Sequence, residues 1–145
     1  MATTETIVLF INAIRPATFA ALDKHYEQTG QRLTPVVLVD ESISESIAER
    51  NGQKAHADRV KVIRANFDDP YSVRNALRPI QDNIIAMTCQ YENSIHELQK
   101  IVPYLPYLPT PSELSLEWST EKKDMREMIG SYNPKLVPGY MEISD

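Results

Sequence analysis

Two charged side chains follow apolar stretches of the chain and could hold a small ligand. Arg15 comes directly after the first apolar stretch, and Glu92 comes shortly after the fourth. A guanidinium group pairs with an anionic ligand, whereas a carboxylate accepts hydrogen bonds from a hydroxyl or an amine. For either residue alone, an ion pair or a capping charge at a strand end is the simpler explanation. We therefore keep Arg15 and Glu92 as candidate substrate-binding residues.

Cys89 and His96 are the other side chains with reactive potential. Cys89 is the only cysteine and lies near the end of the fourth apolar stretch, so it could act as a nucleophile with His96 as its base. We prefer to explain it as a small buried residue, because free cysteine is among the most buried residue types. The three histidines stand at no spacing typical of a metal site. The sequence thus provides no catalytic residue and no metal ligand.

Four apolar, β-rich stretches must position these side chains. They are residues 6–14, 35–40, 60–63 and 83–89. Nearly continuous apolar runs are typical of strands that are covered on both faces in a parallel sheet. Segments with helical spacing alternate with them, which implies right-handed crossovers. The pattern predicts a three-layer α/β fold whose mainly parallel, Rossmann-like sheet has about four strands and flanking helices.

Capping residues mark where the intervening helices begin. Pro16 fits the first turn of a helix, and Gly30 fits its end. Asp68 and Asp69, before Pro70, are explained as capping residues rather than as catalytic acids. Two further helix starts are predicted where a serine precedes a glutamate by three residues, at Ser42/Glu45 and at Ser94/Glu97.

The segment 103–111, PYLPYLPTP, has prolines at three successive third positions. This spacing favours an extended polyproline II path. Such a segment could be a ligand for a proline-recognising domain, but no basic residue flanks the prolines. We prefer a stiff connector whose tyrosine and leucine side chains lie on the surface of the domain.

Beyond the prolines, the pattern predicts two short helices and a strand. Ser112 is expected to cap the first helix and Thr120 the second. The second helix has an apolar face made of Met125, Met128 and Ile129. Residues 140–143 alternate like the first strand of a new sheet, and no partner for that strand is apparent.

Composition and missing motifs exclude several kinds of function. The formal net charge of -5 and the pI near 5.2 argue against a nucleic-acid-binding surface. The apolar run 7–11 is far shorter than the roughly 20 residues of a membrane span and lacks a basic leader. The first turn reads N-A-I-R-P-A instead of G-x-G-x-x-G, and no P-loop occurs, so neither kind of nucleotide site is expected. A single cysteine makes the cytoplasm the simplest location.

The tail carries a combination of residues that resembles a known family. Its parts, in order, are Thr120-Glu121-Lys122, Met125-Arg126, Tyr132-Asn133-Pro134 and Val137-Pro138. Behind β-α units and a proline-rich loop, this order resembles the pre-ATP-grasp domain of ATP-grasp carboxylate ligases, where a (T/S)-D-K-x-x-M-R segment leads toward the ATP-binding part. Glu121 stands where the family has Asp, which keeps the negative charge. The resemblance implies a pre-ATP-grasp domain in residues 1–118 and, in residues 119–145, a linker helix and the start of a truncated ATP-grasp domain.

The resemblance also implies a chemistry for a larger parent enzyme. ATP-grasp ligases use ATP and magnesium to form an acylphosphate from a carboxylate, and an amine or similar nucleophile attacks it. Lys122 matches the family lysine that reaches toward the nucleotide in several members, and Arg126 matches the arginine of the same segment, so both are expected to bind the cofactor. A solvated helix residue is the alternative for Lys122.

Several parts of an ATP-grasp enzyme are missing from these 145 residues. They are the glycine-rich flap, the adenine-binding segment and the magnesium carboxylates. We therefore expect the chain alone to bind no cofactor and to be inactive. Its expected partners are the remainder of the enzyme and a small carboxylate or amine substrate, and the parent could be a homodimer.

A free-standing flavodoxin-like or receiver-like interaction module is the alternative. In such a protein the tail, with its sole tryptophan Trp118 and its tyrosines, would dock a partner, because aromatic side chains dominate interface energetics. A receiver domain requires an acidic pair after its first strand. Asn12 and Arg15 do not supply that pair.

Overall fold

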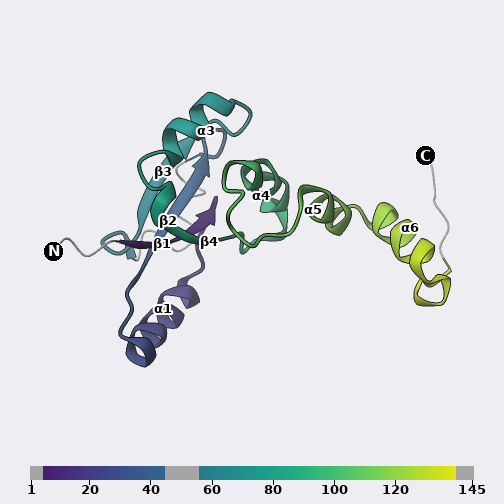
Figure 1. Ribbon diagram of the computed structural model, residues 1–145, viewed down its shortest axis with the longest axis horizontal. Helices are drawn as coiled ribbons and strands as arrows, with labels where there is room; N and C mark the ends of the chain where they lie inside the picture. Colours follow the sequence, from purple (N-terminus) through teal and green to yellow (C-terminus); the bar gives the residue numbers. More distant parts are fainter. Residues whose placement is uncertain (1–4, 45–55, 140–145) are drawn as a thin grey trace.

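A four-stranded, all-parallel sheet in the order β3-β2-β1-β4 forms the centre of the molecule (Figure 1). The computed structural model describes residues 5–44 and 56–139. The strands are β1 (Thr6–Ile11), β2 (Leu33–Asp40), β3 (Lys61–Ala65) and β4 (Ile84–Thr88). The predicted α/β fold with a parallel, Rossmann-like sheet is confirmed.

Helices cover both faces of this sheet. The α-helices are α1 (Pro16–Thr29), α3 (Pro70–Leu77), α4 (Ile95–Ile101), α5 (Glu113–Thr120) and α6 (Lys122–Tyr132). Short 3-10 helices are η3 (Gln81–Asn83), η4 (Glu92–Ser94), η5 (Val102–Tyr104) and η6 (Pro134–Leu136). In Figure 1, α1 lies on one side of the sheet and α3 on the other, which gives the three layers.

Side chains of the central strands alternate between two hydrophobic cores. Leu9 and Ile11 of β1 belong to the larger core, which includes residues of α3 and α4. Phe10 belongs to the smaller core, where it is joined by Phe19 of α1. Each fully buried side chain of this size contributes about 1.5–3 kcal/mol to folding. Burial on both faces explains why β1 appears in the sequence as a continuous apolar run.

The strand order reverses direction at β1. The chain runs from β1 outward to β2 and β3, and then returns across the sheet to place β4 on the other side of β1. Because each parallel crossover is right-handed, helices that connect strands in opposite directions must lie on opposite faces. The positions of α1 and α3 satisfy this rule (Figure 1).

The first strand is shorter than its apolar pattern. It ends at Ile11, three residues before the predicted end, because Asn12 adopts a left-handed backbone with φ of 63°. Ala13 and Ile14 are nevertheless buried, at 2% and 0% exposure. These two residues are apolar because they are buried after the strand ends, so the apolar run in the sequence is longer than the strand.

The second and third strands are longer than predicted. β2 begins at Leu33, ahead of Pro35, although a proline cannot donate to a sheet ladder. Pairing between β2 and β3 starts only at Val36, so β2 has a single neighbour at Pro35. β3 continues to Ala65 through Arg64, whose polar side chain interrupts the apolar pattern and donates to the backbone carbonyl of Ile43.

The predicted helix starts have mixed outcomes. Pro16 lies in the first turn of α1, Gly30 ends that helix with φ of 70°, and the Asp69 carboxylate accepts from the amide of Tyr71. The helix start at Ser94 is confirmed, since Ser94 is the N-cap residue of α4, but the capping box is wrong, because its side chain forms no capping hydrogen bond and η4 leads into the helix. The helix predicted from Ser42/Glu45 falls largely on residues 45–55, outside the described residues.

The proline-rich segment does not follow a polyproline II path. η5 occupies its start, and the amides of Leu105 and Leu108 donate to carbonyls three residues earlier, at 3.2 and 3.1 Å. A polyproline II helix has no such internal hydrogen bonds. Leu105 and Leu108 are buried in the larger core, so the prediction that the leucine side chains lie on the surface is wrong, and the connector closes that core.

The tail extends away from the sheet as two successive helices (Figure 1). Ser112 caps α5 as predicted, and Leu116 of this helix is buried in the larger core. Thr120 does not cap α6, because its hydroxyl donates back to the carbonyl of Glu117 at 2.8 Å. α6 contacts α5 and η6 and buries none of its own residues. The strand predicted at 140–143 lies outside the described residues.

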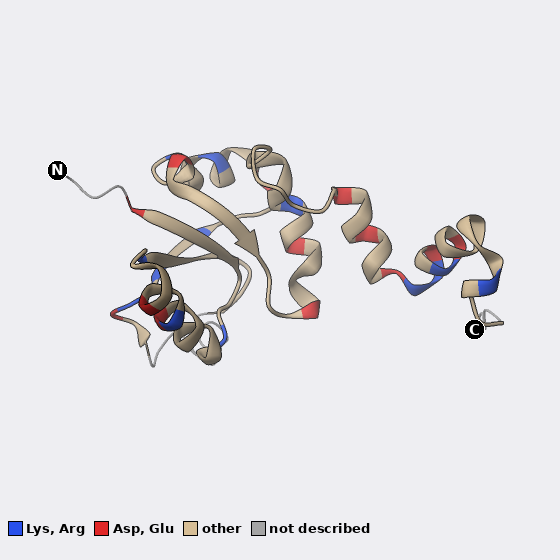
Figure 2. Cartoon of the chain, turned by 60° about the horizontal axis from the view of Figure 1, so that its bottom comes forward, with Lys and Arg blue, Asp and Glu red and all other residues tan. Residues whose placement is uncertain are grey.

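The two tail helices differ in charge. Figure 2 shows only acidic charges on α5, whereas α6 carries both signs. Within residues 5–44 and 56–139, no helix combines the length and the apolarity that crossing a membrane would require.

Hydrogen bonds of Asp40 connect the carboxyl ends of β1, β2 and β3. Its own amide donates to the Asn12 side chain after β1 at 2.9 Å, and its carboxylate accepts from the amides of Ser42 and Phe67 at 2.8 and 2.9 Å. Burial raises the pKa of this carboxyl, but the hydrogen bonds from Ser42 and Phe67 and the charge of Lys100 outweigh burial, so the pKa lies below its ordinary value.

The variant Asp40→Asn tests this role, because an amide offers one acceptor oxygen where the carboxylate offers two. We expect its free energy of unfolding at pH 7 to be about 1–3 kcal/mol lower than that of the wild type. Since the folded pKa is below the unfolded pKa, the ionised Asp40 contributes fully above the unfolded value of about 4 and ceases to contribute as pH falls through the folded pKa. Urea unfolding across this pH range measures both effects, with Asp82→Asn as the exposed control. If the difference in free energy of unfolding between the wild type and Asp40→Asn stayed constant down to pH 2, the charge of Asp40 would not be the source of the stabilisation.

Candidate functional site

The carboxyl ends of β1 and β4 form the place where a ligand is expected. Ligands of open parallel sheets bind outside the carboxyl ends of strands, where the strand order reverses. In this chain the reversal lies between β1 and β4. The loops that follow these strands contain Asn12 to Arg15 and Cys89 to Glu92.

Asn12 turns the chain out of the sheet at the end of β1. Its amide donates to the carbonyl of Leu38 at 2.8 Å, and its side-chain oxygen accepts from the amide of Asp40. Asn is one of the few residues other than Gly that tolerate a positive φ. The buried Asn12 side chain is therefore occupied by the fold, and Arg15 emerges three residues later on the surface.

Gln90 ties the loop after β4 to the start of α1. Its side-chain oxygen accepts from the amide of Arg15 at 2.7 Å and from the hydroxyl of Thr18 at 3.1 Å, and its side-chain nitrogen donates to that hydroxyl at 2.7 Å. The sequence indicated the stretch around Gln90 as a strand end but did not single out this residue. Only the closeness of β1 and β4 in the sheet reveals its role.

A cavity of about 430 Å³ lies beside this link and contains both predicted substrate-binding residues. Its lining consists of Arg15, Tyr91, Glu92, Asn93, His96 and Thr120. The Arg15 guanidinium lies over the Tyr91 ring, 4.9 Å from its centre. A cation–π contact of this kind restricts the direction of the guanidinium while leaving its donors available. Arg15 and Glu92, separated by 77 positions (92 − 15) in the sequence, thus face one cavity.

Thr120 and His96 add two polar side chains to the cavity. His96 extends from α4, and Thr120 is the last residue of α5. The segment Thr120-Glu121-Lys122 therefore begins at the wall of the cavity. Lys122 is exposed and Arg126 is half-buried on α6, and neither lines the cavity.

Cys89 and His96 lie in different surroundings. Cys89 is half-buried and packs against the larger core, whereas the exposed His96 lines the cavity. Burial and the nearby charge of Glu97 raise the pKa of the Cys89 thiol. A raised pKa lowers the fraction of reactive thiolate at neutral pH. Cys89 thus packs against the core as the preferred explanation expects, but it is half-buried rather than buried.

Asp68 and Asp69, which the sequence explains together as capping residues, have separate roles. Asp69 caps α3, whereas the Asp68 carboxylate accepts from the Lys100 ammonium at 2.6 Å. The hydrogen bond to Asp68 raises the pKa of Lys100. The pair connects the loop after β3 to α4, so the capping explanation is wrong for Asp68. Both side chains are exposed, and such pairs add little stability.

Comparisons with protein-family models and with curated proteins found no match to the chain. Within the described ranges, no group of three or more His, Cys, Asp or Glu side chains is placed to hold a metal ion. The candidate site therefore rests on the cavity at the carboxyl edge of the sheet and on the chemistry of its lining residues.

Two substitutions at Asn12 separate its backbone role from its side-chain role. Asn12→Gly keeps the freedom to adopt φ of 63° but loses the acceptor for the Asp40 amide, and we expect a loss of about 1–2 kcal/mol. Asn12→Ala loses the same acceptor and also strains the left-handed backbone, which adds about 1 kcal/mol. Chemical unfolding of the two variants measures the difference. Equal stability of the two variants would rule out a contribution from the backbone conformation.

Proposed function

We propose that this chain is the N-terminal, substrate-side domain of an ATP-dependent carboxylate–amine ligase of the ATP-grasp type. The observation that carries the proposal is where the T-E-K-x-x-M-R segment lies. It starts at Thr120, in the wall of the cavity that also contains Arg15 and Glu92. A parallel sheet whose strand order reverses beside that cavity supports the same proposal.

The lining of the cavity suits a small carboxylate or amine substrate. Arg15 offers several donors to a carboxylate, and its backbone is held in place by Gln90. Glu92 lies in the short helix η4 and accepts from an ammonium or a hydroxyl group. A volume of about 430 Å³ is that of a site for a small organic molecule. The role of this domain would be to bind and orient the substrate.

The nucleotide side of the proposed enzyme begins on α6. Lys122 is exposed in the first turn of this helix, where a flexible ammonium group can pair with phosphate oxygens. Arg126 lies one turn further on, with its side chain half-buried. Since no metal-binding group is found in the described part of the chain, we assign no magnesium ligand to it and derive no reaction step.

Calorimetric titration of the 145-residue chain with Mg-ATP is a direct test. We expect no binding tighter than about 1 mM, because Lys122 and Arg126 alone provide too few contacts to hold a nucleotide. Titration of Lys122→Ala serves as the control for weak, non-specific association. Micromolar binding by the wild-type chain would mean that it is a self-sufficient nucleotide-binding protein.

Steady-state kinetics of the natural protein that contains these residues test the proposed ligase activity and the proposed contacts of Lys122 and Arg126 with ATP. With ADP release as the readout, we expect turnover to require a small carboxylate and an amine. Lys122→Ala and Arg126→Ala should each raise the KM for ATP about tenfold, as expected for loss of one charge-assisted contact to phosphate. Lys123→Ala removes the same charge at the neighbouring position and should leave the KM unchanged. Equal effects on the KM at Lys122 and Lys123 would show that Lys122 is an ordinary solvent-exposed helix residue without a specific contact to ATP.

A protein-interaction module is the second candidate, and the exposed face of α6 favours it. Met125, Met128 and Ile129 are 36%, 41% and 37% exposed. An uncovered apolar face on a helix is a common sign of a docking surface. The receiver-like form of this candidate is weakened by Asn12, whose side chain holds the Asp40 amide instead of presenting an acid. Light scattering that finds a monomer, together with proteolysis that spares residues 119–139, would argue against a docking tail.

A further inference from the structure

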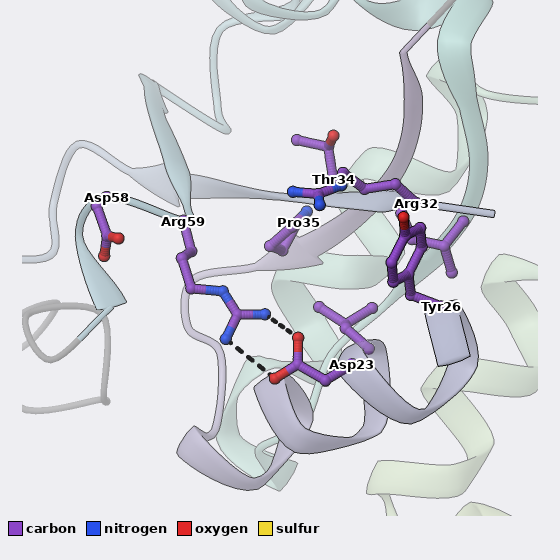
Figure 3. A pocket seen from close by; sticks show the side chains of 9 residues that line it. Asp23, Tyr26, Arg32, Thr34, Pro35, Asp58 and Arg59 are labelled. Carbon is purple, nitrogen blue, oxygen red and sulfur yellow. Dashed lines mark hydrogen bonds and ion pairs between the residues drawn. The ribbon is translucent and has the colours of Figure 1, made fainter. Parts of the chain in front are cut away.

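A second cavity lies at the opposite end of the sheet, where the strands begin. Its volume is about 420 Å³. It is formed by the second half of α1, the first residues of β2 and the segment before β3 (Figure 3). Its lining residues are Leu22, Asp23, Tyr26, Arg32, Leu33, Thr34, Pro35, Asp58 and Arg59. Neither the sequence patterns nor the proposed ligase role assigns a function to it.

Arg32 is a cation of this cavity whose charge is not neutralised by an acidic side chain of the described residues. It is exposed, and its guanidinium lies over the Tyr26 ring, 5.2 Å from the ring centre. A guanidinium on an aromatic face keeps its five donors in one plane and free to bind an oxyanion. In Figure 3 the Arg32 side chain extends toward Thr34 and Pro35. The Thr34 hydroxyl adds a further donor beside the guanidinium.

Of the acidic residues that line the cavity, neither Asp23 nor Asp58 forms an ion pair with Arg32. The Asp23 carboxylate already accepts two hydrogen bonds from Arg59, at 2.5 and 3.2 Å, so these two charges neutralise each other. Figure 3 shows the two dashed contacts and places Asp58 apart from them, on the other side of Arg59. The lining as a whole is not positive, because Asp58 faces this cavity and Glu5 faces the adjoining hollow, but the Arg32 guanidinium itself forms no ion pair with a described acidic side chain.

Apolar side chains form part of the wall next to Arg32. They are Leu22, Leu33 and Pro35, of which Pro35 is buried. A second hollow of about 460 Å³, which the acidic Glu5 also lines, shares Tyr26, Arg32 and Thr34 with the first, so the Arg32–Tyr26 stack lies between two spaces. A ligand bound to Arg32 can thus place an apolar body in one of them.

We propose that this cavity binds a small organic anion, in which Arg32 and Thr34 hold a phosphate or carboxylate group and a short apolar body contacts Leu22 and Pro35. Such a ligand would connect α1 with the amino end of β2 and with the segment that leads into β3. The site lies at the opposite edge of the sheet from Arg15 and Glu92, so its ligand does not compete with one bound there. The proposal is independent of the ligase function.

Titration of the full 145-residue chain with inorganic phosphate and, separately, with succinate tests the site by ¹H–¹⁵N NMR. We expect saturable shifts of the Arg32 side-chain Nε–H signal and of the Thr34 amide. The anion that gives the lower Kd identifies the preferred group. Arg32→Gln should weaken binding about tenfold or more, since it removes a charge-assisted, bidentate contact. Arg32→Lys keeps the charge without the planar fork and should bind with intermediate strength.

Two control variants distinguish the site from general attraction of anions. Arg78→Gln removes an exposed arginine at the end of α3, and Arg15→Gln removes the arginine of the carboxyl-edge cavity. Both should leave the shifts at Arg32 and Thr34 unchanged. Amide spectra of each variant establish that it is folded. Shifts that do not saturate, an Arg32→Gln variant that binds like the wild type, or equal weakening in Arg78→Gln would each overturn the proposal.

Discussion

The hydrogen bond between the Asn12 side chain and the Asp40 amide is the contact on which the carboxyl edge of the sheet depends. It fixes the ends of β1 and β2 to each other, and the Asp40 carboxylate extends the connection to Phe67 beyond β3. Buried polar groups are costly unless they are paired, and here the hydrogen bonds of Asp40 with Asn12 and with Phe67 join the ends of different strands. These contacts fix the end of β1, from which the loop that carries Arg15 starts, and Gln90 ties the loop after β4, which carries Glu92, to the amide of Arg15.

The fold followed from the sequence wherever burial dictated residue type. The four strands were found because both faces of the central sheet are covered, which leaves apolar residues at almost every position of β1 and β2. Boundaries were missed where one tertiary contact overrides a local pattern. Arg64 continues β3 by reaching the Ile43 carbonyl, and the Leu105 and Leu108 side chains draw the proline-rich segment into the core. No repeating pattern of residues in the sequence indicates either contact.

Part of the candidate site was also accessible from the sequence. Arg15 and Glu92 were identified because charged residues directly after buried strands must emerge at the carboxyl edge. Their common cavity depends on β1 and β4 being neighbours, and that strand order cannot be read from the chain. Gln90 and the Arg32 cavity were missed for a related reason. A neutral amide in a loop and an arginine before a strand have no distinguishing type or spacing, and only the packed structure shows what they face.

The junction at Glu121 affects the direction of α6. Glu121 is the single non-helical residue between α5 and α6, with φ of −96° and ψ of 101°. α5 is anchored to the core by Leu116, whereas α6 buries no residue. The direction of α6 relative to α5 is therefore set by the two backbone angles of Glu121 and by the contacts between the two helices. A different pair of angles at Glu121 would redirect α6 and leave Leu116 buried in the core.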